Sequence, residues 1–271
     1  QSRLTNNLYV TAGMRFDDHS AAGSENSKRA SIAYLFDDKN TKLKSSYGTG
    51  IKYPALYEFY KNEGTTSLVA ETGRSYDIGI EKAYPEKGIK FDITYFNHKY
   101  EDMIEGQKRT GWVVQNVSGT VRSKGLELFS QYKLSNSINF DLNYTYTSTY
   151  DGADFDDPDV GPQSNGAFTN SQLVRVPRHF INLRSKVSPI KDLNITLKTK
   201  WSDEMRDYEN TNSTVGGDQR LKSFLVNDLT ANYILPNGYK AFFKVDNIFD
   251  EVYSTALEYN QMDRSFNFGI K

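Results

Sequence analysis

A dense acidic cluster is the first feature of this sequence that could do chemistry. Carboxylate oxygens at short spacing are ligands that Ca²⁺ prefers. The cluster lacks the glycine and the closing glutamate of an EF-hand loop. A solvated acidic loop is therefore the favoured interpretation and a calcium site is the alternative, and no other cofactor is expected. The cluster comprises Asp151, Asp154, Asp156, Asp157 and Asp159.

The three histidines, His19, His98 and His179, lie far apart in the sequence. A histidine beside a serine can act as base and nucleophile, as in phospholipases built on membrane barrels. No recognisable catalytic constellation surrounds any of the three, so the sequence predicts no enzyme. The pair Arg178 and His179 is expected to anchor the end of a strand instead. Because the chain contains no cysteine, disulfides and thiolate metal sites are excluded.

The composition narrows the class of protein. Lys plus Arg total 33 against 34 for Asp plus Glu, so charge gives no argument for nucleic acid as a partner. Hydrophobic residues make up 37% of the chain, and no run approaches the ~20 apolar residues of a membrane-spanning helix. Nineteen Tyr and sixteen Phe are many for so polar a sequence. A transmembrane β-barrel, in which alternate residues face lipid, stays open and is favoured over a soluble β-protein.

Residues 125–146 show most clearly how the chain is organised. From Ile138 to Tyr146, apolar and aromatic residues alternate with Asn, Asp and Thr, which predicts a strand with one apolar and one polar face. The segment from Leu126 to Tyr132 alternates in the same way, and residues 133–137 form a short polar turn between the two. The stretch is therefore expected to be an antiparallel hairpin.

Long and short connections alternate along the whole chain. This asymmetry is typical of up-and-down outer-membrane barrels, which have long external loops and short periplasmic turns, whereas a sandwich has no reason to sort its loops. We expect about 12 antiparallel strands in an all-β transmembrane barrel. Long loops are predicted at residues 17–27, 51–73, 102–111, 151–174, 207–219 and 250–263, and short turns at 37–41, 84–88, 133–137, 188–192 and 236–238. Residues 54–60 are expected to form one helical turn, and a bulge is expected near residues 118–119.

Five segments, in order, resemble the C-terminal half of the barrel of TonB-dependent outer-membrane receptors. The first, YGTGIKYPALYEFY, resembles the family's YGTGFKAPSLxELY stretch, and the others resemble its N-V…G-x-E, R-x-PRH, N-[LIV]-F-D-x-x-Y and GRSF motifs. The PRH motif and the overall spacing look most like the cobalamin-receptor branch. The segments are Tyr47–Tyr60, Asn116–Leu128, Arg175–His179, Asn247–Tyr253 and Arg264–Phe266.

The resemblance implies import of a scarce ligand across the bacterial outer membrane, with cobalamin as the first expectation and an iron-siderophore as the second. It implies that residues 1–271 are the C-terminal portion of a barrel of about 22 strands. The N-terminal plug, the TonB box and the first strands are not recognised, the start of the sequence does not resemble a signal peptide, and Asp263 replaces the glycine before Arg264. We therefore expect a fragment of a receptor that contacts TonB through its plug.

The resemblance assigns roles to several aromatic and charged residues. For each residue taken alone, a packing role is the more conservative interpretation. Candidates for the aromatic girdle at the membrane interface are Trp112, Trp201, Tyr144, Tyr146, Tyr150 and Tyr233. Candidates for ligand contact in external loops are Tyr57, Tyr60, Tyr208 and Tyr259. Residues expected to pair across strands inside the barrel, or to face the plug, are Lys198, Lys200, Glu127, Asp141 and Asp228.

Two alternatives remain open on the sequence. A self-contained barrel of about 12 strands could act as a passive channel or an outer-membrane enzyme. A soluble β-rich binding domain is the other, and it predicts solubility without detergent.

Overall fold

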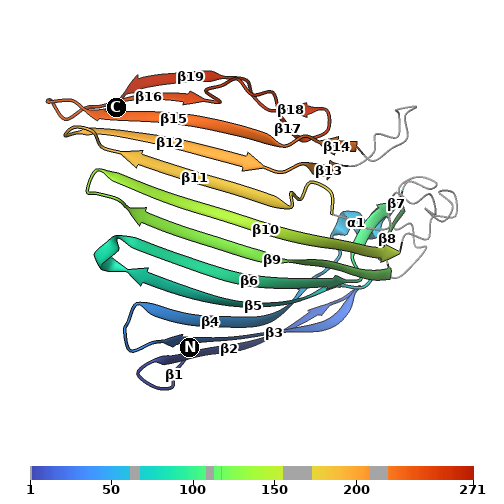
Figure 1. Ribbon diagram of the computed structural model, residues 1–271. Coiled ribbons are helices and arrows are strands. Elements are labelled where there is room, and N and C mark those ends of the chain that lie inside the picture. Colours follow the sequence, from blue (N-terminus) through green and yellow to red (C-terminus); the bar gives the residue numbers. More distant parts are fainter. Residues whose placement is uncertain (1, 62–67, 108–112, 117, 155–172, 208–218) are drawn as a thin grey trace. The chain divides into compact units, whose positions relative to one another are not determined.

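A single main sheet dominates the computed structural model, which describes residues 2–61, 68–107, 113–116, 118–154, 173–207 and 219–271 (Figure 1). The sheet has 13 strands, and each pairs with the next one along the chain. This confirms the predicted up-and-down order of about 12 strands, since β1 contains only two residues. The strands are β1 (Ser2–Arg3), β2 (Leu8–His19), β3 (Gly23–Leu35), β4 (Thr41–Lys52), β5 (Glu71–Tyr84), β6 (Ile89–Glu101), β9 (Ser118–Lys133), β10 (Ile138–Asp154), β11 (His179–Val187), β12 (Leu193–Ser202), β15 (Phe224–Ile234), β16 (Lys240–Asp246) and β19 (Ser265–Ile270).

The chain divides into two compact units, and four of the strands contribute residues to both. The first unit comprises Gln1–Ile80, Tyr95–Gly125 and Ser148–Leu173. The second comprises Glu81–Thr94, Leu126–Thr147 and Val174–Lys271. Each unit has its own small hydrophobic cluster, built by residues that follow the ends of the long strands.

Side chains alternate between the two faces of the sheet, as the sequence predicts. In the second unit, Tyr144 of β10 pairs with Ile181 of β11, and Ile181 pairs with Trp201 of β12, so these three residues share one face. On the other face, Asp141 pairs in register with Arg184. The Asp141 carboxylate lies 2.6 Å from the Arg184 guanidinium and accepts a hydrogen bond from Gln131, so Asp141 pairs across strands, one of the two roles expected for it.

Local chemistry explains the short turns. Asp38 accepts hydrogen bonds from the backbone N–H groups of Asn40 and Thr41, which closes the turn between β3 and β4. The turn between β5 and β6 is a 3₁₀ helix, η1 (Pro85–Lys87), and ends at Gly88 with φ of 62°. A Cβ atom at Gly88 would lie 2.5 Å from the Lys133 carbonyl oxygen, so both the left-handed backbone and the close strand require glycine there.

Several predicted long loops contain additional strands, and the one predicted at residues 17–27 is wrong. There β2 and β3 continue into a tight hairpin, with Asp17 paired to Glu25 and His19 paired to Gly23. Both faces of this extension are polar, so hydrophobic alternation could not reveal it. The expected bulge near residues 118–119 stays a prediction, because the neighbouring residue 117 lies outside the described ones; Gly119, within β9, has a φ of 101°.

Three two-stranded sheets lie among the long connections. They pair β7 (Ile104–Gln107) with β8 (Val113–Asn116), β13 (Met205–Asp207) with β14 (Gln219–Leu221), and β17 (Ser254–Ala256) with β18 (Tyr259–Asn260). The predicted helical turn is confirmed as α1 (Leu56–Lys61). Among the described residues, no helix has the length and apolar character needed to cross a membrane.

Candidate functional site

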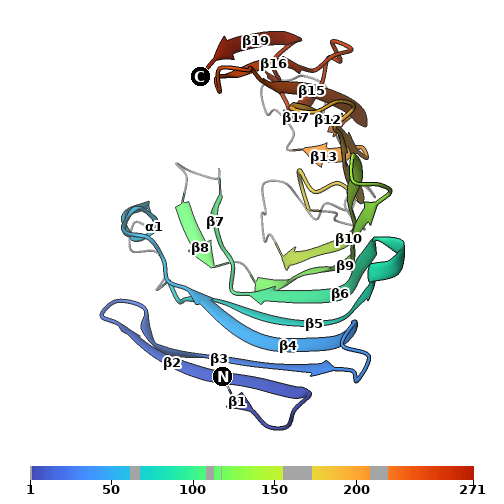
Figure 2. The same cartoon turned by 90° about the vertical axis from the view of Figure 1, so that its left-hand side faces the viewer.

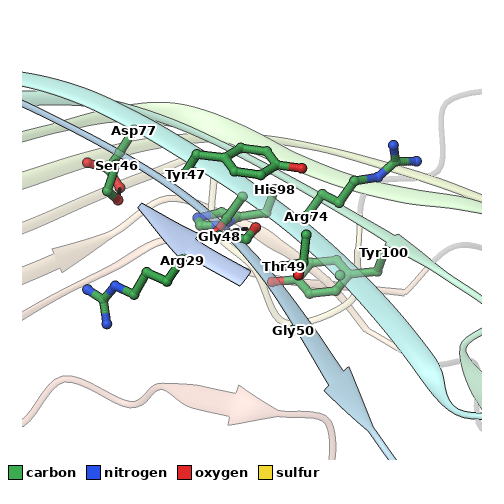
Figure 3. Close-up of a pocket in the computed structure, with 12 residues that line it drawn as sticks. Arg29, Ser46, Tyr47, Gly48, Thr49, Gly50, Arg74, Asp77, His98 and Tyr100 are labelled. Carbon is green, nitrogen blue, oxygen red and sulfur yellow. Dashed lines mark hydrogen bonds between the residues drawn. The ribbon is translucent and has the colours of Figure 1, made fainter. Parts of the chain in front are cut away.

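A groove of about 390 Å³ lies on the polar face of β3–β6 in the first unit (Figure 3). Small residues make room for it, because glycine and serine occupy alternate positions on two neighbouring strands. Gly73 is the tightest position: a Cβ atom there would lie 3.3 Å from the ring of Tyr100. The small residues are Ser46, Gly48 and Gly50 on β4 and Gly73 and Ser75 on β5.

Polar and aromatic side chains form the walls of this groove. Asp77 accepts a hydrogen bond from the Ser46 hydroxyl, and its backbone carbonyl accepts one from the Ser45 hydroxyl. The His98 ring lies between Phe96 and Tyr100, with centroid distances of 5.3 and 6.5 Å. The groove therefore offers hydrogen-bonding groups beside a row of planar rings, which suits a polar surface or ligand better than an apolar one.

Residues after the strand ends of the first unit form a hydrophobic cluster, hereafter the first loop cluster. Phe59 of α1 packs against buried Leu68, Ile104 and Val114, so α1, β7 and β8 lie together at one end of the strands (Figure 2). The Asn116 side chain stabilises this cluster through three hydrogen bonds. It accepts one from the Val69 N–H at 2.9 Å and donates the others to the backbone carbonyls of Val69 and Asp102.

The hairpin tip of β2 and β3 also contacts α1 and the residues just before it. The His19 ring stacks on Tyr53 at 5.0 Å and on Phe59 at 5.7 Å. Nδ1 of His19 accepts hydrogen bonds from the N–H groups of Ala21 and Ala22. The Tyr53 hydroxyl donates to the Asp17 carbonyl, and desolvation together with the Asp17 charge raises the pKa of Tyr53. The extended hairpin thus helps to position α1.

The second unit has its own cluster, hereafter the second loop cluster. Tyr253 and Leu257, which precede β19, pack against buried residues of β13, β14 and β15. The Lys200 ammonium lies 5.2 Å from the centroid of Phe224 and 5.8 Å from that of Tyr253, within reach of cation–π attraction. Burial, with a smaller effect of Asp228, raises the pKa of the Tyr253 phenol. The buried residues are Met205, Leu221, Phe224 and Val226.

The buried carboxylate of Asp207 holds three loop segments of the second unit together. The Asp207 side chain is 0% exposed, and its Oδ1 accepts from Nε of Arg175 at 2.7 Å. Its Oδ2 accepts from the Leu257 N–H at 2.6 Å. Arg175 precedes β11, Asp207 ends β13 and Leu257 follows β17, so one side chain fixes segments that are 32 and 50 residues away in sequence.

The N-I-F-D segment forms a turn that returns the chain after β16. Asn247, with φ of 53°, donates its N–H to Asp228 and accepts from the Glu251 N–H through Oδ1. Asp250, with φ of 57°, accepts from the Arg264 N–H. Asn and Asp tolerate this left-handed backbone better than other residues with side chains, which explains both residue types in the motif.

The candidate ligand tyrosines are exposed where they are described. Tyr57 and Tyr60 share α1 and are 64% and 79% exposed, and Tyr259 on β18 is 70% exposed. The structure brings Tyr57 and Tyr60 together, whereas Tyr259 belongs to the other unit and Tyr208 lies outside the described residues. Ligand contact stays a prediction for all four.

The side chains of the acidic cluster, residues 151–159, lie outside the described ones. In the part of the chain that is described, no three acidic or imidazole side chains are grouped so that they could hold a metal ion. His179 begins β11, as expected, and its Nδ1 lies 2.9 Å from the Tyr144 hydroxyl. That contact supports an anchoring role at the strand end.

The girdle candidates of the second unit lie on one face of the sheet. Trp201 and Tyr144 share a row, the Tyr146 ring lies 5.2 Å from the His179 ring, and Tyr233 lies opposite Leu193. From Leu193 to Trp201 the strand advances about 26 Å, close to the height of the apolar band of a membrane barrel. Tyr150 is exposed in the first unit, and Trp112 is not among the described residues. The membrane role of these residues stays a prediction.

Sequence reasoning missed the groove and the two polar side chains that hold the loop clusters, Asn116 and Asp207. The groove had a usable signal, because small residues recur with period two at residues 46–50 and 73–75. Asp207 had none, since its partners are distant in sequence.

The chain matches the family model described as TonB dependent receptor-like, beta-barrel over residues 1–248. The vitamin B12 transporter of Vibrio cholerae is 24% identical over 266 residues, which are 96% of this chain and 39% of the transporter. The ferric enterobactin receptor of Pseudomonas aeruginosa is 23% identical over 280 residues, which are 89% of this chain and 35% of the receptor. These relatives are a transporter and a receptor, and the chain spans well under half of either.

Solved structures show the same fold. A variant of the Pseudomonas aeruginosa receptor in complex with enterobactin aligns with a TM-score of 0.79 at 20% identity, covering 99% of this chain and 43% of that one. The siderophore receptor of Acinetobacter baumannii aligns with a TM-score of 0.76 at 19% identity, covering 97% and 43%. The predicted fold class and the resemblance read from the motifs are both confirmed. The chain belongs to the TonB-dependent receptor family and carries the fold of its β-barrel domain.

Proposed function

We propose that this chain supplies barrel wall and external loops to an outer-membrane transporter that imports a scarce ligand with energy from TonB. The match to the family model over residues 1–248 carries this proposal. The two faces of the sheet support it, because an apolar face suits lipid and a polar face suits the interior of a barrel. The energised plug lies outside this chain, so the fragment alone does not transport.

Orientation follows from the connections. The short turns, such as that between β5 and β6, belong on the periplasmic side, and both loop clusters belong on the external side. The external side then presents Tyr57 and Tyr60 from the first loop cluster and Tyr259 from the second, which are the residues proposed to contact ligand. A calcium site at the acidic cluster of residues 151–159 remains the weaker proposal.

Cobalamin is the first ligand candidate and an iron-siderophore the second. The Arg175–His179 motif and the overall spacing favour the cobalamin branch. The named relatives do not separate the two, because the B12 transporter and the enterobactin receptor are 24% and 23% identical to this chain.

An uptake assay with the full-length parent protein tests the proposal. The protein is expressed in a Gram-negative host that lacks its own receptors for both ligands, and uptake of radiolabelled cyanocobalamin and of ferric enterobactin is measured. We expect saturable uptake of one ligand, cobalamin first, that disappears when TonB is deleted. Uptake that is independent of TonB would instead indicate a passive channel, and a protein found in the soluble fraction would overturn the proposal.

A further inference from the structure

The face of β5 that carries its even-numbered residues changes its chemistry in a regular way along the strand. Arg74, Tyr76, Ile78 and Ile80 are all exposed on this face, and Arg74 also borders the groove, while Asp77 points to the other face. Going away from the loop end, the order is cation, tyrosine, aliphatic, aliphatic. Successive residues on one face are about 6.6 Å apart, so the change from charge to hydrocarbon takes place within about 13 Å.

The neighbouring strand β6 repeats the order in the same direction. The rings of Tyr95 and Tyr76 lie 6.1 Å apart, and the Asn97 amide donates to both hydroxyl groups. One step nearer to the strand end, Lys99 and Arg74 both bind the carboxylate of Glu101. The two strands therefore carry cations at one level and tyrosines at the next.

The next strand of the sheet, β9, adds two more cations. Arg122 and Lys124 are exposed, Ser123 between them is partly buried, and the flanking residues Val121 and Gly125 are buried, so both cations lie on the exposed face. Lys124 acts electrostatically on the Tyr95 hydroxyl, in agreement with a position on the same face of the sheet as the tyrosines.

We propose that this basic–aromatic patch binds the phosphorylated headgroup of a membrane lipid. Its order of charge, tyrosine and hydrocarbon matches the order of headgroup, interface and acyl chain that a lipid presents across half a bilayer. Four cations within three adjacent strands attract an anionic headgroup. The patch consists of Arg74, Tyr76, Tyr95, Asn97, Lys99, Glu101, Arg122 and Lys124.

Charge complementarity favours an anionic lipid headgroup, rather than water alone, as the partner of these strand ends. Glu101 is shared between Arg74 and Lys99, so these two cations outnumber the carboxylate that they contact. A strand end that only needed solubility would not require tyrosines directly below the charges, nor an amide that aligns their hydroxyl groups. Tyrosine in this position has an apolar ring for the acyl chains and a hydroxyl for the headgroup. The inference rests on the proposed function in one respect, since it places this face against the outer membrane.

The test measures lipid binding to the full-length protein, extracted from outer membranes in a mild detergent. The probe is a bis-phosphorylated lipid A, compared with the same lipid after enzymatic removal of its phosphates, and bound lipid is counted by native mass spectrometry. The variant replaces the four cations together, as Arg74→Gln, Lys99→Gln, Arg122→Gln and Lys124→Gln. We expect the wild-type protein to prefer the phosphorylated lipid and the variant to bind it at least about tenfold more weakly.

A matched control removes four lysines from the opposite ends of the strands, at or beside the short turns. It changes the net charge by the same amount and should leave binding unchanged. Resistance of the folded barrel to SDS at room temperature shows that both variants fold. The control substitutions are Lys39→Gln, Lys87→Gln, Lys191→Gln and Lys240→Gln.

Two results would overturn the proposal that this patch binds lipid. One is equal binding of the two lipids by the wild-type protein, and the other is an equal loss of binding in the control variant. Neither result affects ligand uptake, which is measured separately. A protein that imports its ligand but fails the lipid test refutes only the patch. A protein that is absent from the outer membrane refutes the proposed function itself.

Discussion

The first and second loop clusters are stabilised by different polar groups. Each packs a few apolar side chains beyond the ends of the strands and fastens them with one side chain that reaches several segments. In the first cluster that side chain is the neutral amide of Asn116. In the second it is the carboxylate of Asp207, which is buried and bound to Arg175. A buried carboxylate depends strongly on its partners, so the second cluster should be the more rigid and the more vulnerable to a single substitution.

Substitution of Asp207 should produce the largest effect. Asp207→Ala removes the acceptor of the hydrogen bonds from Arg175 and from the Leu257 N–H, and hydrogen bonds to a charged group contribute about 1.5–3 kcal/mol each. Hydrogen exchange in the full-length protein should therefore accelerate at residues 254–260 and 219–221, while the main sheet stays protected. The control is Glu204→Ala, because the pair of Glu204 with Arg220 is about half exposed on both sides and contributes about 0–1 kcal/mol. Equal acceleration in both variants would contradict the distinction between the clusters.

Substitution of Asn116 should have a smaller effect. Asn116→Ala removes three hydrogen bonds, each with a net contribution of about 0.5–1.5 kcal/mol, and should speed exchange at residues 68–70 and 102–104. Asn116→Asp retains the acceptor for the Val69 N–H but loses both donors, so it should fall between the wild type and Asn116→Ala. An Asn116→Ala variant that is less stable than Asp207→Ala would reverse our ranking of the two clusters.

Ligand affinity tests the exposed loop tyrosines of each unit separately. Tyr60→Ala and Tyr259→Ala should each weaken binding by on the order of tenfold, since exposed tyrosines are frequent binding hot spots. The corresponding phenylalanine variants retain the ring and should lose less. Equilibrium binding to whole cells with the identified ligand measures all four. If neither alanine variant changes the affinity, the assignment of these tyrosines is wrong.

The groove beside the first cluster should give the smallest effect. A methyl group at Gly73 would press against the Tyr100 ring at 3.3 Å, whereas one at Gly48 would meet its nearest neighbour at an ordinary 3.6 Å. We expect Gly73→Ala to lower the melting temperature by about 2–4 °C, equivalent to about 1 kcal/mol, and Gly48→Ala to change it less. The reverse order would show that Tyr100 moves freely and that Gly73 is not needed for packing.

The regular part of this fold was predictable from the sequence because alternation follows directly from having two different faces. Residues such as Ile138 to Tyr146 and Leu193 to Trp201 alternate strongly and become strands with close to the expected bounds. The hairpin tip from Asp17 to Glu25 was missed because both of its faces are polar. Where the environment is the same on both sides, period two leaves no hydrophobic trace.

The candidate site was predictable only where one segment carries it. The exposed tyrosines of α1 could be named because the helix and its motif are local in sequence. Asp207 could not, because its role arises from partners 32 and 50 residues away. The basic–aromatic patch was equally hidden, since its order of charge, tyrosine and aliphatic residues becomes visible only when β5, β6 and β9 lie side by side.

The most direct test of the account is which face of β5 meets lipid. The chain contains no cysteine, so a single cysteine can be placed at Ile78 or at Asp77, neighbours on opposite faces of the strand, in a full-length protein otherwise free of cysteine. A fluorophore on each cysteine is then exposed, in reconstituted bilayers, to brominated lipid and to aqueous iodide. We predict that brominated lipid quenches the label at position 78 and iodide quenches the label at position 77. Iodide quenching of both labels to the same extent would contradict a membrane-spanning sheet.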